Sequence, residues 1–176
     1  MQGEKILQGK RILIVDDEPD ILETLEELLD MCLIDTAPNF ETAKKFLDKY
    51  TYDVAVLDIM GVKGYDLLKL ATQKGIPALM LTAHALSPDY LVKSVKGGAK
   101  SYIPKEKISD MSTFVGDILE AHMRGIEKDS TWFARLRPFF DKRFGPEWRR
   151  KDEEFWKGFD ETYTNRISKQ ELGEIM

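Results

Sequence analysis

The stretch that decides the fold of this chain is Tyr52-Asp53-Val54-Ala55-Val56-Leu57-Asp58. Its centre, from Val54 to Leu57, is apolar throughout and β-branched at alternate positions. Such a run is typical of a strand that is buried on both faces of a parallel sheet. One carboxylate, Asp58, follows the run directly. Because ligands of open α/β sheets bind at the carboxyl ends of the strands, the sequence places Asp58 at a chemical site.

Three further apolar runs, at residues 11–15, 78–81 and 101–103, also end in polar residues. The polar residues that follow them are Asp16, Asp17, Glu18, Thr82 and Lys105. Parallel strands bring their carboxyl ends to one edge of the sheet, so these groups are predicted to lie near Asp58. Carboxylates, a hydroxyl and an ammonium can together hold a divalent cation and a phosphoryl group.

Helical periodicity of apolar residues fills the segments between the predicted strands. The pattern predicts helices over 19–31, from Asn39 as N-cap through residue 47, over 65–72, 87–98 and 108–124, and a weak strand over 32–37. Residues 1–9 are polar with two glycines and are predicted to form a short tail. Five successive strand-helix units predict an α/β fold, a doubly wound five-stranded parallel sheet with helices on both faces.

The ordered set of polar strand ends resembles the receiver domain of two-component response regulators. The residues that carry the resemblance are the acidic pair Asp16-Asp17, Asp58, Thr82, Lys105 and, three residues before the lysine, Tyr102. The resemblance covers residues 9–125 and implies the flavodoxin-like fold of that family. We therefore expect a receiver domain over residues 1–125 and a short all-helical extension over residues 126–176.

The resemblance also implies a chemistry. Asp58 would accept a phosphoryl group from a sensor histidine kinase or phosphotransfer protein, with Thr82 and Lys105 contacting that group and Tyr102 acting as a switch. The implied cofactor is Mg²⁺, and its implied ligands are Asp16, Asp17, Asp58 and the backbone carbonyl of Met60. The output would be contact with a downstream protein target. Beyond self-phosphorylation from a phosphodonor and autodephosphorylation, no enzyme activity is implied.

Two departures from the family pattern concern the site. The usual loop after the phosphoacceptor has a proline four residues on and a glycine eight on, whereas here Gly61 and Gly64 come three and six residues on. We therefore expect a shortened loop and a different entry into the next helix. The family also has a proline, joined by a cis peptide, after the lysine, whereas Glu106 follows Lys105 here. Because a cis bond before a non-proline residue costs about 2.5–4 kcal/mol, Lys105-Glu106 is expected to be trans.

Two other functions stay open at this point. A degenerate receiver could serve as an unphosphorylated interaction module, which the two departures favour and the complete charged set opposes. A Mg-dependent phosphohydrolase could use a similar sheet, but such enzymes typically carry a D-x-D pair after a strand, and Asp58-Ile59-Met60 lacks the second acid.

Composition excludes several classes of protein. The apolar fraction of 43% is sufficient for a packed core, and the net charge of −5 gives no indication of nucleic-acid binding. The single cysteine, Cys32, cannot form an internal disulfide. The longest nearly apolar window, Ile76 to Leu86, is too short to insert into a membrane, and no signal peptide precedes Lys10. We expect a soluble, cytoplasmic protein.

The last 51 residues differ in composition, since they hold all three tryptophans and six of the nine phenylalanines. The pattern predicts two or three helices, interrupted at Pro138 and at Gly145-Pro146. We expect these aromatic residues either to dock on the face formed by the predicted helices 87–98 and 108–124 or to form a homodimer.

Residues 160–171 resemble a degenerate EF-hand calcium loop, with Asp160 and Glu171 at the first and twelfth positions. The simpler interpretation is a capping box over Ser168 to Glu171 that opens a last helix.

Overall fold

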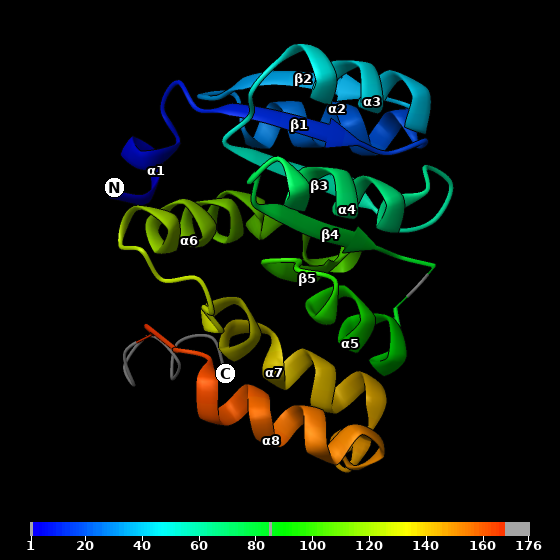
Figure 1. The fold of residues 1–176 in the computed structure, drawn as a ribbon, viewed down its shortest axis with the longest axis vertical. Helices are drawn as coiled ribbons and strands as arrows, with labels where there is room; N and C mark the ends of the chain where they lie inside the picture. Colours follow the sequence, from blue (N-terminus) through cyan, green and yellow to red (C-terminus); the bar gives the residue numbers. More distant parts are fainter. Residues whose placement is uncertain (1, 85, 168–176) are drawn as a thin grey trace.

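The computed structural model describes residues 2–84 and 86–167 and contains one five-stranded sheet (Figure 1). The strands are β1 (Arg11–Val15), β2 (Leu33–Ala37), β3 (Val54–Asp58), β4 (Ala78–Thr82) and β5 (Ser101–Pro104). All four neighbouring pairs are parallel, and the order is β2-β1-β3-β4-β5. This is the flavodoxin-like order of a doubly wound sheet, as predicted.

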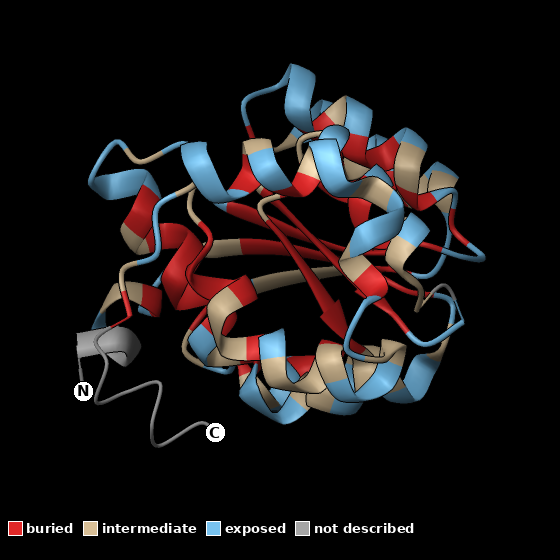
Figure 2. Cartoon of the chain, turned by 90° about the horizontal axis from the view of Figure 1, so that it is seen from below, coloured by how far each residue is buried: buried red, intermediate tan, exposed pale blue. Residues whose placement is uncertain are grey.

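Helices cover both faces of this sheet. They are α2 (Pro19–Leu28), α3 (Phe40–Lys49), α4 (Gly64–Gln73), α5 (Pro88–Lys96) and α6 (Met111–Met123), which the 3-10 helix η1 (Lys105–Asp110) precedes. Helix α2 contacts α6, whereas α3 contacts α4, whose Tyr65 stacks on Tyr90 of α5. Figure 2 shows the buried strands lying between the layers of helices.

Strand β3 occupies the centre of the sheet because its sequence tolerates burial on both sides. All five of its residues are buried, and it pairs with β1 on one side and β4 on the other. The helix after β2 begins where the sequence predicts, since the Asn39 side chain accepts a hydrogen bond from the Thr42 amide at 2.9 Å. Ser87 caps α5 in the same way through the Tyr90 amide.

The prediction of a tail over residues 1–9 was wrong. Residues Gln2–Leu7 form helix α1, which packs against α6. Leu7 of this segment is fully buried, and its carbonyl oxygen lies 3.4 Å from the Cys32 sulfur. Gly9, with a φ of +72°, then turns the chain into β1. The buried Leu7 and the partly buried Ile6 hold this segment against the core.

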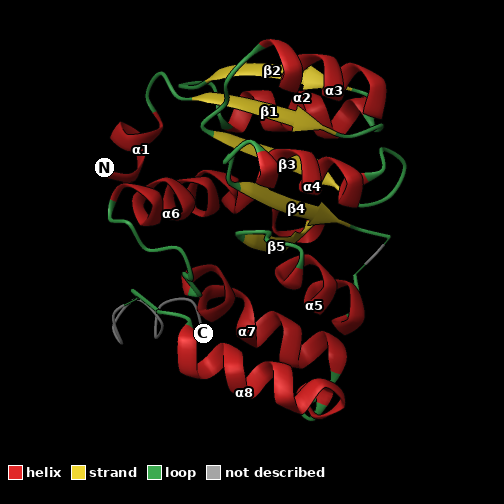
Figure 3. Ribbon diagram, viewed as in Figure 1, coloured by secondary structure: helices red, strands yellow, loops and turns green. Residues whose placement is uncertain are grey.

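The extension is helical, as predicted, in the part of the chain that is described (Figure 3). It contains α7 (Thr131–Phe144), the 3-10 helix η2 (Trp148–Asp152) and α8 (Glu153–Thr162). The predicted break at Gly145 is confirmed, because α7 ends there with a φ of +93°. The predicted break at Pro138 was wrong, since this residue lies inside α7. The adjacent buried side chains, Leu136 and Phe140, hold both halves of α7 against the core and offset the missing hydrogen bond.

The aromatic side chains of the extension dock on the receiver part rather than remaining exposed. Helix α7 contacts β5 and α6, and the Phe140 ring lies 6.2 Å from the Tyr102 ring of β5. Trp148 and Trp156 continue the same apolar cluster. The first of the two alternatives for the aromatic residues is therefore confirmed.

The possible calcium loop starts inside a helix rather than in a loop. Asp160 belongs to α8, and its carboxylate accepts a hydrogen bond from Arg149 at 2.7 Å. Ser168 and Glu171 lie outside the described residues, so the calcium loop and the capping box stay predictions. None of the described helices is both long and apolar enough to cross a membrane.

Candidate functional site

The carboxyl edge of the sheet brings Asp58 close to two other predicted site residues. Asp58 ends β3 and is only 4% exposed. The Lys105 ammonium, which follows β5, lies 3.6 Å from Asp58 Oδ1 and 2.8 Å from Asp16 Oδ2. The register of the parallel strands produces this arrangement, because β1, β3, β4 and β5 all end at the same edge.

The acidic residues after β1 form the second part of the site. Carboxylate oxygens of Asp16, Asp17 and Glu18 all lie within 4.8 Å of one another. Glu18 was predicted to lie at this edge but was given no role in the chemistry, yet its Oε1 accepts a hydrogen bond from Lys105 Nζ at 3.1 Å. Its position directly after the acidic pair was the indication in the sequence. Hard carboxylate oxygens gathered in this way suit a divalent cation.

Burial makes the charged form of the carboxylates in this cluster unfavourable in free energy. It raises the pKa of Asp58 to about 7, and the neighbouring charge of Asp16 adds to the shift while that of Lys105 opposes it. Burial also raises the pKa of Asp16, although the Lys105 ammonium beside it acts to lower it. Burial lowers the pKa of Lys105, but its contacts with Asp16 and Asp58 outweigh this effect, so the ammonium stays charged. The site therefore carries carboxylates that a second cation would stabilise.

Thr82 and Tyr102 lie on the two strands next to Asp58 and Lys105, β4 and β5. Thr82 ends β4, is buried, and pairs in register with Pro104, the neighbour of Lys105. The Tyr102 side chain is fully buried. Its hydroxyl accepts a hydrogen bond from the Ser87 amide at 3.1 Å and donates one to the Ser87 carbonyl at 3.4 Å. Tyr102 thus ties β5 to the loop that leads from Thr82 to α5.

The loop after Asp58 passes very close to the acidic cluster. A Cβ atom added at Gly61, where φ is +87°, would lie 2.4 Å from Asp17 Oδ2. One added at Gly64 would lie 2.2 Å from the Asp58 carbonyl oxygen. Met60, which directly precedes Gly61, is 45% exposed. Lys63, in the left-handed conformation with a φ of +55°, leads directly into α4. Glycines at 61 and 64 therefore permit the shortened loop.

Replacing Gly64 by alanine is expected to destabilise the protein by about 1–3 kcal/mol, the range for overpacked sites. The obstacle is main chain, which no rotation of a side chain can relieve, so the Asp58 segment must shift. Chemical denaturation measures the effect. The matched control is Gly158→Ala in α8, where an added Cβ meets nothing within 4 Å and stability should rise by about 0.5–1 kcal/mol. Equal effects of the two changes would contradict the steric explanation.

The segment after Lys105 takes the predicted form. The described residues contain no cis peptide, so Lys105-Glu106 is trans. Helix η1 begins at Lys105, and the exposed Glu106 side chain forms an ion pair with Arg143 of α7. His84 is 75% exposed, with its Nε2 atom 3.9 Å from Glu18 Oε1.

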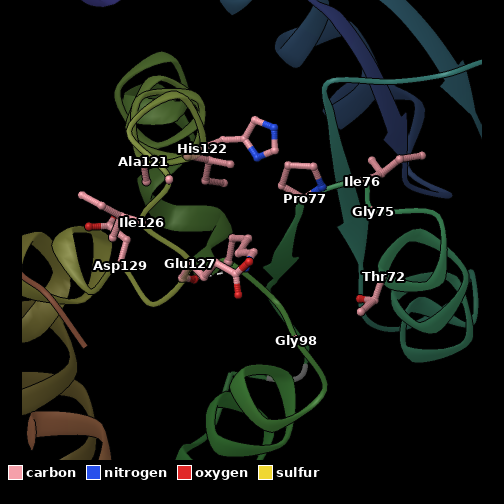
Figure 4. Close-up of a pocket in the computed structure, with 13 residues that line it drawn as sticks. Thr72, Gly75, Ile76, Pro77, Gly98, Ala121, His122, Ile126, Glu127 and Asp129 are labelled. Carbon is pink, nitrogen blue, oxygen red and sulfur yellow. Dashed lines mark hydrogen bonds between the residues drawn. The ribbon is translucent and has the colours of Figure 1, made fainter. Parts of the chain in front are cut away.

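A separate cavity of about 470 Å³ lies at the opposite edge of the sheet (Figure 4). Pro77 and Lys100 line it just before β4 and β5, together with His122 of α6 and Glu127 of the linker. No residue of the Asp58 cluster contributes to this cavity, so it plays no part in the chemistry of that cluster.

An open, doubly wound parallel sheet with a charged cluster at its carboxyl edge defines a ligand-binding α/β protein. The sequence model of the response regulator receiver domain matches residues 12–115. The chain belongs to the response regulator receiver domain family.

Relatives and solved structures agree with this assignment. The two-component response regulator ARR10 of Arabidopsis thaliana is 35% identical over 104 residues, which are 55% of this chain and 19% of that protein. The heme response regulator HssR of Staphylococcus aureus is 38% identical over 98 residues, or 53% of this chain and 43% of that protein. The chain thus spans less than half the length of these relatives. A CheY-like receiver domain protein from Methanospirillum hungatei has a TM-score of 0.61 at 26% identity, covering 67% of this chain and 99% of its own.

Proposed function

We propose that this chain is a phosphoacceptor receiver in a two-component phosphorelay, with Asp58 as the accepting residue. The observation that carries the proposal is the buried contact between Asp58 and Lys105, at 3.6 Å, inside an acidic cluster. The donor is a phosphohistidine on a sensor histidine kinase or phosphotransfer protein. The output is contact with a downstream protein target, and the proposed compartment is the cytoplasm. Like receivers in general, the chain is not a classical enzyme.

The residues present fit a Mg²⁺ ion. Mg²⁺ prefers oxygen ligands, and the cluster offers carboxylates whose raised pKa values mark a shortage of positive charge. Among the described residues, the buried Asp16 Oδ2 accepts no well-aligned hydrogen bond, although the Lys105 ammonium is near it. Asp17, Asp58 and the Met60 carbonyl would hold the ion, and Asp16 would act through bound water. When bound, the ion neutralises charge on the carboxylates and on the transferring oxygens.

The remaining chemistry belongs to the side chains. A carboxylate oxygen of Asp58 attacks phosphorus, so a P–O bond forms while the P–N bond breaks and the donor histidine leaves with the bonding electron pair. The Lys105 ammonium neutralises charge on the phosphoryl oxygens. The Thr82 hydroxyl then donates a hydrogen bond to one of them. An unphosphorylated interaction module is not favoured, because both departures from the family pattern leave every charged group in the cluster.

Asp58→Ala is expected to abolish phosphorylation, because no other carboxylate ends the central strand. The measurement is the intact mass after incubation with acetyl phosphate and Mg²⁺. The wild type should gain one phosphate, and so should the matched control Asp66→Ala, which removes an exposed carboxylate eight residues away. An adduct that persists in Asp58→Ala would contradict the assignment, as would a wild type that forms no adduct and binds no beryllofluoride.

A further inference from the structure

The cavity at the edge of the sheet opposite Asp58 has the size of a small-molecule site (Figure 4). Its volume of about 470 Å³ falls within the range of ligand pockets in proteins. Residues from four segments line it, namely the end of α4 with the turn before β4, the turn before β5, the last turns of α6, and the linker after α6. Because the linker forms one wall, the cavity depends on the extension as well as on the receiver part.

The inner wall of this cavity is aliphatic. Ile76, Ile118 and Ala121 are only 5–6% exposed, and they line the cavity together with Pro77 and Ile126. No phenylalanine, tyrosine or tryptophan is among the described residues that line it. Such a wall favours an aliphatic group in the ligand, because removing apolar surface from water is the main favourable contribution to burial.

Two opposite charges line the same cavity without an ionic partner. The Lys100 ammonium donates a hydrogen bond to the Glu127 backbone carbonyl, yet it forms no ion pair with any described residue. The Glu127 carboxylate likewise pairs with no described cation. Asp129, the other acid in the wall, is already neutralised by Arg166 at 3.0 Å. The cavity therefore presents one cation and one anion that a ligand can pair with.

The hydrogen bond of Lys100 limits the distance between these two charges. Its Nζ atom lies 3.1 Å from the carbonyl oxygen of Glu127 itself. The ammonium and the Glu127 carboxylate are therefore separated by at most that bond and the length of one glutamate side chain, although they form no ion pair. A gap of this size admits a group that carries a carboxylate and an ammonium on one carbon atom. Its carboxylate can accept from Lys100 while its ammonium donates to Glu127.

We propose that this cavity binds a free α-amino acid with an aliphatic side chain. Lys100 recognises the carboxylate of the ligand, Glu127 recognises its ammonium, and the aliphatic wall buries its side chain. The ligand then joins the receiver part to the linker. This inference does not depend on phosphorylation of Asp58, because no residue of the Asp58 cluster lines the cavity.

Titration of the isotope-labelled full chain with L-leucine, followed by nuclear magnetic resonance, tests the proposal. L-leucine should shift the amide signals of residues 98–100 and 125–129, with a Kd of about 1 mM or lower. Isocaproate lacks the ammonium of leucine and L-leucinamide lacks its carboxylate, so each should bind about tenfold more weakly. Either analogue binding as tightly as leucine would overturn the assignment. No shift of these signals at up to about 10 mM leucine would overturn it as well.

Two substitutions test the two charges separately. Lys100→Met and Glu127→Gln keep the approximate length of each side chain, remove its charge, and should each weaken leucine binding about tenfold. In Lys100→Met the preference for leucine over leucinamide should also disappear, and in Glu127→Gln the preference over isocaproate. Lys69→Met, which removes an exposed lysine of α4 outside the cavity, is the control and should bind leucine like the wild type. Preferences that persist in both cavity variants would overturn the proposed recognition.

Discussion

Asp58→Asn should stabilise the metal-free protein by on the order of 2–4 kcal/mol at about pH 8. The wild-type carboxylate is buried beside Asp16, and its pKa is raised from 3.8 to about 7. Each unit of such a shift corresponds to about 1.4 kcal/mol of differential stability. Asparagine has nearly the same shape and carries no charge, so it removes this cost. A residue central to the proposed function would thus be unfavourable for the stability of the empty site.

The pH dependence of this effect has a defined sign. Between the ordinary pKa of an aspartate and about 7, folded wild type binds more protons at Asp58 than the unfolded chain does. Stability contributed by this group therefore falls as pH rises through that window. The difference between Asp58→Asn and wild type should be small at about pH 4 and largest above about pH 7. Urea denaturation across this range, in the presence of a chelator, measures it.

Mg²⁺ supplies a second measurement on the same variants. Saturating Mg²⁺ should raise the unfolding free energy of the wild type, because it binds the folded cluster, and should raise that of Asp58→Asn less. The exposed Asp66 of α4 provides the control, and Asp66→Asn should change stability by less than about 0.5 kcal/mol at every pH. A wild type that is more stable than Asp58→Asn in the chelator at high pH would rule out the electrostatic cost.

The sheet could be predicted because its sequence requirements are local and redundant. The apolar run of β3 favours the interior of a parallel sheet, and every residue of the strand is indeed buried. A side-chain cap at Asn39 needs only the next three residues to form. The right-handed connections of parallel strands then fix where Asp58 and Lys105 meet.

The errors arose where a distant contact overrides the local preference. Gln2–Leu7 is too short and polar to predict a helix, and the packing of Leu7 and Ile6 against the rest of the core explains it. Pro138 ordinarily interrupts a helix, yet the packing of α7 on β5 tolerates it. Such contacts depend on which surfaces meet, and no single segment of sequence encodes that information.

For the site, the sequence identified most of the residues but not the contacts between their side chains. The acidic pair, Asp58 and Lys105 follow from the strand ends, whereas the role of Glu18 as a partner of Lys105 depends on the side-chain geometry. The replacement of proline by Glu106 looked like a loss at the level of the sequence. In the structure Glu106 forms an ion pair with Arg143 of the extension, and only the docking of α7 places those two side chains together.

Arg166→Ala should lower the free energy of unfolding by about 3–5 kcal/mol, the cost of breaking a buried ion pair by removing one partner. The Asp129 carboxylate, now 10% exposed, would keep the Thr131 hydroxyl as its one side-chain hydrogen-bond donor within the described part of the chain. The change also removes the hydrogen bonds that Arg166 donates to the Glu120 carboxylate and to the Asp117 carbonyl. Arg166→Lys should recover less than half of the loss, because an ammonium cannot reproduce the paired contacts of the guanidinium.

The same variant tests how the chain is divided. All three tryptophans lie in the extension, so their fluorescence reports its unfolding, while far-ultraviolet circular dichroism reports the whole chain. In the wild type the two transitions should coincide, since Trp148 and Trp156 share one apolar core with β5. In Arg166→Ala the fluorescence transition should come at lower denaturant, because Arg166 no longer ties the extension to Asp117 and Glu120 of α6. Arg150→Ala, which breaks a pair with exposed partners, should leave both transitions in place. Coincident transitions in Arg166→Ala would mean that the extension and the receiver part form a single cooperative unit even without the contacts of Arg166.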